Sequence, residues 1–414
     1  MASSLPTTTI SRQRLAEGFW RAAMVSLVVM PLGMAIAHRS SPLFIVLSAV
    51  LCLLAARLEG RARSFWSDVS SALTAPLGIA VLAFFGWCLI SIGWSEFKIV
   101  SIRAFGEFWL PIAASVVLAL TLPQRLTPRM FGFLVGTFTL AGLIIIVELQ
   151  TGMILRKTLG VRSDPYIFNR PVLTLLMLAL PLTAWLLSTK RNGGVYGLLL
   201  LLFLGAVAIQ SESDAAVLAL AIVCLVFPIA WLAPRLTFVL AVAAFLAAVS
   251  LSPLIGALSA KFMTPEMHRM LATGHSKERV ELWQSFGAVV REEPLLGTGF
   301  GVSPRMPDTK VAAKVPVEHQ PMLNIGHPHN AVLQIWVELG AVGALLFLVI
   351  AFLSLRAIWH LPHLIRSASL ALLAGIVPVS LVGHGAWQGW WAASLGAALI
   401  WMQAVRRIQT ETTQ

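Results

Sequence analysis

Runs of about 20 apolar residues recur from one end of this 414-residue chain to the other. Such a segment crosses the hydrocarbon core of a bilayer as an α-helix, because a helix satisfies its own backbone hydrogen bonds there. Hydrophobic residues make up 58% of the chain and charged residues only 12%, which is more apolar than a soluble domain requires. The alternating ten-residue pattern of a membrane β-barrel is absent from the sequence. The sequence therefore predicts an all-α polytopic membrane protein.

We predict about twelve transmembrane helices, divided into two groups by one long polar segment. They cover residues 20–37, 42–56, 76–92, 105–120, 131–149, 168–187, 195–209, 215–232, 236–251, 331–357, 367–381 and 387–405. The chain then has three regions. Residues 1–251 hold the first nine helices, residues 252–328 form a long loop, and residues 329–414 hold the last three.

Basic residues in the short connections predict the orientation, because Lys and Arg favour the cytoplasmic side. One set of connections, together with both tails, carries roughly twice as many basic residues as the opposite set. This bias predicts cytoplasmic termini and places the long loop on the other side of the membrane. The net charge of +12 lies at segment ends, where it suits anionic lipid and gives no reason to expect nucleic acid.

The long loop is predicted to be partly helical. Ser276 can cap an amphipathic helix over residues 277–291, and Pro294 ends it. Arg279 and Trp283 lie on the apolar face of this helix, at helical spacing. We expect Arg279 to point inward, with contact to lipid phosphate as the alternative. The glycines after Pro294 are expected to form a flexible turn that lets backbone approach a ligand.

The candidate catalytic residue is His329, where the loop meets the next apolar run. Pro328 discourages helix before it, so we predict a helix that starts there, with His329 and Asn330 in its first turn. Unpaired N–H groups and the helix dipole at such an end attract anions and disfavour a charged imidazole. A neutral His is a candidate general base near pH 7, although a plain capping role for His329 and Asn330 remains open.

Further polar groups lie near this start. Glu338 falls on one helical stripe with Asn330 and Gln334, which we expect to face the bundle interior. All three cysteines fall inside apolar runs and are interpreted as small buried residues. The sequence has no CxxC, HExxH, P-loop or dinucleotide fingerprint, so we expect neither a metal nor a nucleotide cofactor.

These residues resemble the O-antigen ligase and O-antigen polymerase superfamily of bacterial inner-membrane glycosyltransferases, which are GT-C-like. The signature is His-Asn, nine residues, then Gly-x-x-Gly, here 329–330 and 340–343. Upstream, Arg279 and Trp283 match, as does Pro-Leu-Leu-Gly-Thr-Gly at 294–299. The sequence departs from the family around Asp214, where ligases often carry an Arg.

The resemblance implies inverting transfer of a glycan from undecaprenyl diphosphate to a sugar hydroxyl of lipid A–core, on the periplasmic face of the inner membrane. No metal or nucleotide would be needed, and the partners would be the two lipid-linked substrates and membrane lipid. The implied catalytic base is His329. Arg279 would bind the diphosphate, with Arg170 and Arg162 as weaker candidates. Asn330 or Glu338 would orient the base or bind sugar, and Trp283 would stack on sugar or anchor in lipid.

Four other functions can be compared with these features. A polymerase or a protein O-oligosaccharyltransferase of the same superfamily uses the same donor and differs in its acceptor. A secondary transporter with twelve helices should show two related halves and broken helices near the midplane, and the sequence shows no such repeat. A purely structural scaffold explains neither the long loop nor its ordered motifs.

Overall fold

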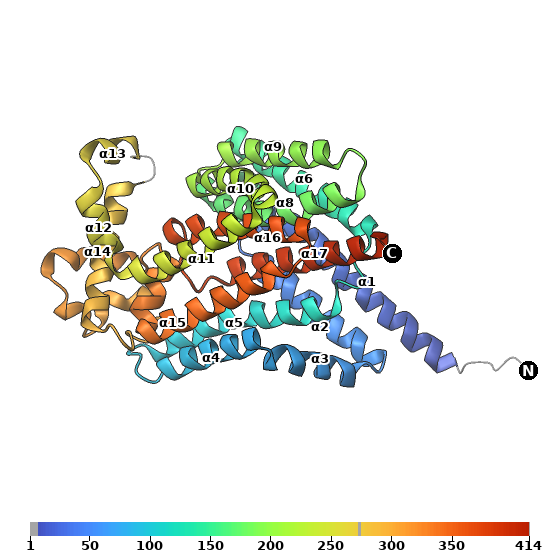
Figure 1. Ribbon diagram of the computed structural model, residues 1–414, viewed down its shortest axis with the longest axis horizontal. Helices are drawn as coiled ribbons and strands as arrows, with labels where there is room; N and C mark the ends of the chain where they lie inside the picture. The colour runs from blue at the N-terminus through green and yellow to red at the C-terminus, as the bar shows by residue number, and fades with distance from the viewer. Residues whose placement is uncertain (1–6, 272–274, 414) are drawn as a thin grey trace, which may run out of the picture.

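The computed structural model describes residues 7–271 and 275–413, and within them it is built of helices without any strand (Figure 1). Each of the twelve predicted segments is a helix. The fold class is therefore confirmed. The twelve helices are α1 (Thr7–Ile36), α2 (Ser41–Leu58), α4 (Pro76–Ser91), α5 (Lys98–Thr121), α6 (Pro128–Gln150), α8 (Asn169–Thr189), α9 (Gly193–Gln210), α10 (Asp214–Leu232), α11 (Pro234–Leu251), α15 (Ala331–Trp359), α16 (His363–Val382) and α17 (Gly389–Thr413).

The number of spans is smaller than predicted when length and composition are judged together. Among the described residues, ten helices are long and apolar enough to cross a membrane. Helix α4 becomes an eleventh only when it is joined to α3 (Ala62–Thr74), from which it is bent by 79°. Helix α17 is not among them, because its second half carries Gln403, Arg406 and Arg407.

Helix α8 forms the buried centre of the bundle. All of its residues from Pro171 to Leu186 are buried, and it packs against α9, α16, α17 and α1. Its sequence is apolar on nearly every face, which is the pattern of a helix surrounded by protein. The N-terminal end of this central helix carries Arg170.

The long loop folds onto one end of the bundle. It contains α12 (Ile255–Phe262), α13 (Pro265–Met270), α14 (Ser276–Glu292) and several short 3-10 turns. Figure 1 shows α12, α13 and α14 together at this end. Helix α14 buries Trp283 and Phe286 against α12 and α15, so its apolar face packs on protein. Ser276 does not cap α14 as predicted, since its hydroxyl bonds to His268 at 3.0 Å.

We call the end with α14 the loop end and the opposite end the tail end. At the tail end, the Trp20 indole N–H donates to Glu59 at 2.8 Å, and Arg407 donates to the carbonyl of Pro123 at 3.1 Å. Helix α1 therefore starts, and α17 ends, at the same end of the bundle (Figure 1). The connections that follow α1, α6, α9 and α16 lie at the loop end.

Candidate active site

Asn330 begins helix α15 as its N-cap. Its side-chain oxygen accepts from the N–H of Leu333 at 2.9 Å, and the residue is fully buried. The helix starts at Ala331, so the prediction that His329 lies in the first turn is wrong. His329 has a φ of 49° and precedes the helix in the left-handed region, which is uncommon for a residue with a Cβ. Asn330 orients the helix start and, being buried, does not face a sugar.

A single peptide group, the one between Pro328 and His329, is held at both of its polar atoms. The indole N–H of Trp283 donates to the Pro328 carbonyl at 3.1 Å, and the N–H of His329 donates to Nδ1 of His327 at 3.2 Å. These two bonds fix the peptide plane and support the unusual φ of His329. Trp283 is only 8% exposed, so its side chain packs within the protein next to this peptide. The expected role of Trp283 as a lipid anchor is therefore corrected.

The His329 ring has one nitrogen engaged by protein. Its Nδ1 lies 3.4 Å from the carbonyl oxygen of Gly383, in the connection between α16 and α17. A carbonyl can only accept, so Nδ1 carries the proton in this contact. The other nitrogen, Nε2, then presents a lone pair. This is the tautomer that a general base requires.

The surroundings of His329 keep its imidazole neutral. Burial lowers the pKa of His329 below its ordinary value of 6.5, the contact with Gly383 partly offsets this, and the Arg279 guanidinium lowers the pKa further. Burial also lowers the pKa of Arg279, while the carboxylate of Asp214 acts in the opposite direction. The structure therefore brings His329 and Arg279 into one electrostatic neighbourhood. Asp214, one of the acids at the position where the family signature is broken, faces the same guanidinium.

Two histidines that the sequence analysis did not assign lie beside His329. The His327 ring centre is 4.2 Å from that of His329, and burial lowers the pKa of His327 to about 4. Burial, together with Arg170, the other two histidines and Arg279, lowers the pKa of His384 to about 3. His384 lies between the last two predicted spans, which was the available indication in the sequence.

Glu338 holds parts of the fold together. The residue is fully buried, and its carboxylate accepts from the N–H of Gly301, the N–H of Ser303 at 3.2 Å and the Ser303 hydroxyl. It also accepts from Gln334 at 2.8 Å and from the indole of Trp387 at 2.6 Å. These donors occupy the hydrogen-bond acceptor sites of the carboxylate. His329 is not among these donors, so Glu338 does not orient it by a hydrogen bond, and a contact of Glu338 with sugar stays a prediction. Glu338 joins the long loop, α15 and the α16–α17 connection.

A break at Gly340 lets the long loop lie against α15. Gly340 has φ 64° and ψ −163°, which glycine alone adopts readily. The N–H of Ala341 donates to the carbonyl of Pro294 at 2.9 Å, and the N–H of Gly299 donates to the carbonyl of Glu338 at 2.9 Å. The expectation that these loop glycines approach a ligand is corrected. They let two backbones meet, and both halves of the sequence signature form one packing unit.

The two weaker arginine candidates lie in different surroundings. The Arg170 guanidinium stands 5.9 Å from the ring centre of Trp390, whose ring is 5.1 Å from that of His384. Arg162 donates to Asp164 at 2.6 Å, and its side chain is 56% exposed. The structure thus places Arg170 beside the histidines and Arg162 at the surface with a carboxylate partner.

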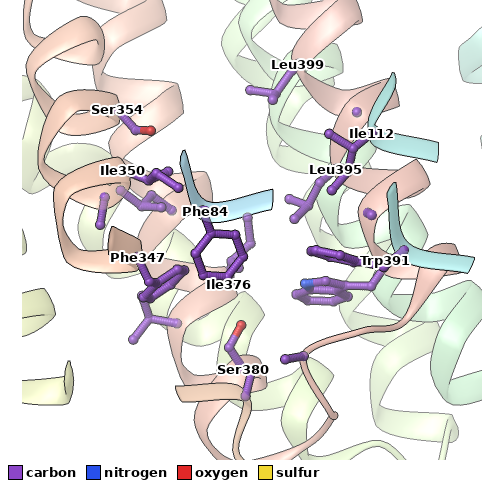
Figure 2. A pocket seen from close by; sticks show the side chains of 18 of the residues that line it. Phe84, Ile112, Phe347, Ile350, Ser354, Ile376, Ser380, Trp391, Leu395 and Leu399 are labelled. Carbon is purple, nitrogen blue, oxygen red and sulfur yellow. The ribbon is translucent and has the colours of Figure 1, made fainter. Parts of the chain in front are cut away.

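An apolar cavity of about 560 Å³ begins next to this site and extends between α4, α5, α11, α15, α16 and α17. Figure 2 shows Phe347, Ile376 and Trp391 facing it. Ala331, the first residue of α15, and Ala386, close to His384, also line it. The cavity therefore places hydrocarbon-compatible space beside the neutral histidines. Among the described residues, no group of three or more His, Cys, Asp or Glu side chains is arranged to hold a metal ion.

Known proteins resemble this chain over the same region. The sequence profile of the family described as O-Antigen ligase matches residues 197–348, which include α14, His329 and the glycines of α15. A protein of Rickettsia felis named "Putative polysaccharide ligase" is 25% identical over 332 residues, 76% of each chain. A polysaccharide ligase of Rickettsia bellii, also named as putative, is 26% identical over 334 residues, which are 78% of each chain. Another from Rickettsia conorii is 25% identical over 329 residues, which are 77% of this chain and 76% of the relative.

The resemblance found in the sequence is confirmed by this match and by the all-helical bundle that carries it. The names of the family and of the relatives support a function of the polysaccharide ligase type in general terms. The chain is therefore similar to the O-antigen ligase family over residues 197–348 and to polysaccharide ligases of Rickettsia over about three quarters of its length.

Proposed function

We propose that the protein transfers a glycan from undecaprenyl diphosphate to a sugar hydroxyl of lipid A–core, without metal or nucleotide, at the periplasmic face of the bacterial inner membrane. The observation that carries this proposal is His329, whose Nδ1 contacts the Gly383 carbonyl and whose pKa is lowered by burial and by the Arg279 guanidinium. A base and an anion-binding cation are the two groups that such a transfer needs.

His329 activates the acceptor. Its Nε2 takes the proton of the acceptor hydroxyl while that oxygen forms a bond to the anomeric carbon of the donor sugar. The bond between this carbon and the diphosphate oxygen breaks, and the diphosphate leaves with the electron pair. Attack from the face opposite the leaving group inverts the anomeric centre. A placed general base contributes roughly 10²–10⁴-fold to such a rate.

Arg279 holds the leaving diphosphate. A guanidinium binds phosphate oxygens through two parallel N–H bonds, which stabilises the charge as it develops. Helix α14 presents Arg279 from the same face as Trp283, which holds the peptide before His329. One helix therefore sets the positions of both the cation and the base. This arrangement also limits the movement of one relative to the other.

The apolar cavity supports a lipid-linked donor. Its lining is apolar apart from Ser115, Ser354, Ser380 and Gln403, and it reaches the start of α15. Part of a polyprenyl chain can lie there while the diphosphate remains at the loop end. The site lies at one end of the bundle rather than at mid-membrane, which favours an enzyme over the alternative of a secondary transporter.

The proposal is tested by reconstituting the purified protein in nanodiscs with undecaprenyl-diphosphate-linked glycan and lipid A–core. A gel of the products should show glycan on lipid A–core, and a chelator should not change the yield. Extension of the lipid-linked glycan itself would instead identify the polymerase, and transfer to added protein would identify the protein O-oligosaccharyltransferase. Failure of all three reactions would reject glycosyl transfer.

A deletion strain provides an independent test. A ligase mutant should accumulate long glycans on the lipid carrier and lose them from lipopolysaccharide. A polymerase mutant should instead transfer single repeats. Complementation with the wild-type chain and with His329→Ala separates loss of chemistry from loss of the protein.

A further inference from the structure

Arg170 is a half-buried cation that the protein leaves without an acidic partner. Its Nε is buried without a hydrogen-bond partner, and among the described residues 7–271 and 275–413 its guanidinium forms no ion pair. Its guanidinium lies over the face of the Trp390 ring, 5.9 Å from the ring centre. A cation at the membrane boundary is costly unless an anion or water compensates it.

A second arginine assembles the surroundings of Arg170 and is itself satisfied. Arg156 donates to the carbonyls of Ala35 at 3.0 Å and Ile36 at 2.6 Å, and to the carbonyl of Arg162 at 3.3 Å. These bonds hold the connection that bears Arg162 against the connection that bears Arg39. The guanidinium of Arg156 is satisfied by backbone carbonyls, whereas that of Arg170 has no ion pair within the described residues.

The resulting cluster is strongly positive. Arg39 and Arg162 are the electrostatic neighbours of Arg170. Burial and four arginines, Arg170 first, lower the pKa of His38 to about 4, so this imidazole adds no charge at pH 7. Asp164 is the carboxylate that contacts Arg162, and it leaves the charges of Arg39 and Arg170 uncompensated. We call Arg39, Arg162 and Arg170 the outer arginine cluster.

The outer arginine cluster and Arg279 both lie near the histidines of the candidate active site. Arg279 acts on His329, and Arg170 and Arg279 both act on His384. The His384 ring packs edge-on against Trp390, the same tryptophan that Arg170 faces. His384 therefore marks the boundary between two cationic regions at the loop end.

We propose that the outer arginine cluster is a second anion subsite, which binds a phosphate group on the acceptor glycolipid while Arg279 holds the diphosphate of the donor. This inference rests on the proposed function and replaces the diphosphate role that the sequence suggested for Arg170 and Arg162. Two anionic lipid headgroups must be held at once, and each needs its own cations because their phosphates repel each other. Guanidinium groups bind phosphate bidentately, so three of them select a phosphorylated sugar over a neutral one.

The test measures acceptor binding without donor. The full chain is placed in nanodiscs of phosphatidylcholine and titrated with phosphorylated lipid A–core and with the same glycolipid after enzymatic dephosphorylation. Wild-type protein should bind the phosphorylated form about tenfold to a hundredfold more tightly. Arg170→Gln should remove most of this preference. The double variant Arg39→Gln/Arg162→Gln changes exposed side chains only and should do the same without affecting the fold.

A matched control carries two arginine substitutions at the tail end, Arg57→Gln and Arg63→Gln, and should keep the preference. Equal affinity of the wild-type protein for the two glycolipids would overturn the proposal, as would an equal loss in the control. Repeating the titration with phosphatidylglycerol in the nanodisc distinguishes the sources of phosphate. If this lipid abolishes the preference, the cluster binds bulk headgroups and the proposal is rejected.

Binding and transfer are read separately. Loss of transfer with the binding preference intact would refute the proposed function and leave the subsite standing. Transfer that proceeds equally well with the dephosphorylated acceptor, in a protein that binds both forms alike, would refute the subsite and leave the proposed function standing.

Discussion

Two arginines at opposite ends of the bundle face tryptophan rings, and they differ in what balances their charge. At the tail end, Arg125 lies 3.9 Å from the ring centre of Trp20 and donates to both oxygens of Glu59 at 3.0 and 2.9 Å. At the loop end, Arg170 faces Trp390 at 5.9 Å, and no carboxylate in the described part of the chain forms an ion pair with it. The chain completes the first cation by itself and leaves the second for an anion from outside.

At the loop end, the carboxylate of Glu338 and the imidazole of His329 also differ in whether the protein supplies all of their hydrogen-bond partners. Glu338 is saturated by donors of the protein, whereas Nε2 of His329 presents a lone pair. Polar groups that hold the fold have their partners within the chain. The guanidinium of Arg170, which is proposed to bind substrate phosphate, forms no ion pair within the described residues, and Arg125, which is paired with Glu59, serves as its control.

The largest effect is expected from His329→Ala. Transfer should fall by roughly 10²–10⁴-fold, because the acceptor hydroxyl loses its base. Initial rates of the purified, reconstituted variant measure this, and size-exclusion elution confirms that the protein is folded. Arg125→Gln at the tail end should keep wild-type transfer. Activity of His329→Ala within tenfold of wild type would remove the base role.

Arg279→Lys should reduce kcat/KM for the donor by about tenfold to a hundredfold, because an ammonium is a point charge and cannot bind two phosphate oxygens in parallel. The same exchange at Arg125 should change transfer by less than about twofold. Donor titrations with a fixed acceptor make the measurement. If lysine at 279 serves equally well, the bidentate contact is not needed.

The pH dependence of transfer should be set by charged groups at the loop end and not by those at the tail end. The pKa of His329 lies below 6.5, so its active neutral form dominates at pH 7 and activity is lost as pH falls through that pKa. Arg279→Gln removes a positive neighbour, which raises the pKa of His329 and should move the acidic midpoint of kcat/KM to higher pH. Arg125→Gln should leave the midpoint unchanged. If Arg279→Gln leaves the acidic midpoint of kcat/KM unchanged, the charge of Arg279 does not affect the pKa of His329.

Smaller effects are expected from the two side chains that hold the peptide before His329. Trp283→Phe removes only the N–H bond to the Pro328 carbonyl and should lower kcat by about fivefold, as expected for one hydrogen bond of about 1 kcal/mol. His327→Asn keeps an acceptor near the position of Nδ1 and should retain more activity than His327→Ala. Equal kcat values for the two variants at position 327 would show that this bond does not position the base.

The smallest effect concerns stability and sharpens the comparison of the two ends. Arg125→Gln should lower the free energy of unfolding by about 1 kcal/mol, because Glu59 loses the shorter of its two ion pairs and keeps only the one with Arg61. Arg170→Gln removes an unpaired, half-buried charge and should leave stability unchanged or increase it. Thermal unfolding in one detergent, with tryptophan fluorescence as the readout, compares both variants. A larger loss at Arg170 than at Arg125 would mean that the fold depends on Arg170.

Much of the fold followed from the sequence because the bilayer imposes it. Each long apolar run has to become a helix, and all twelve predicted segments did. The amphipathic face of α14 also predicted that Arg279 and Trp283 pack inward, because the helical period places them together. The start of α15 was harder to predict. Pro328 permits a helix directly after it, but His329 adopts a left-handed backbone conformation and the helix begins only at Ala331.

The partners of buried polar groups were beyond the reach of sequence patterns. Glu338 was interpreted as part of a functional stripe, because position on a helix tells which way a side chain points and not which donors meet it. His384 was left unassigned for the same reason, since it joins the site from a connection more than fifty residues after His329.

By itself, then, the sequence determined a helical membrane bundle and the motif that marks its family, because hydrophobic length and local spacing are properties of the chain. Only the tertiary structure decided which polar residues meet. Helix packing brings the connections of α1, α6, α9, α14 and α16 to one end, and at that end the distances between side chains, not their order along the chain, determine which charges are balanced and which remain for a substrate.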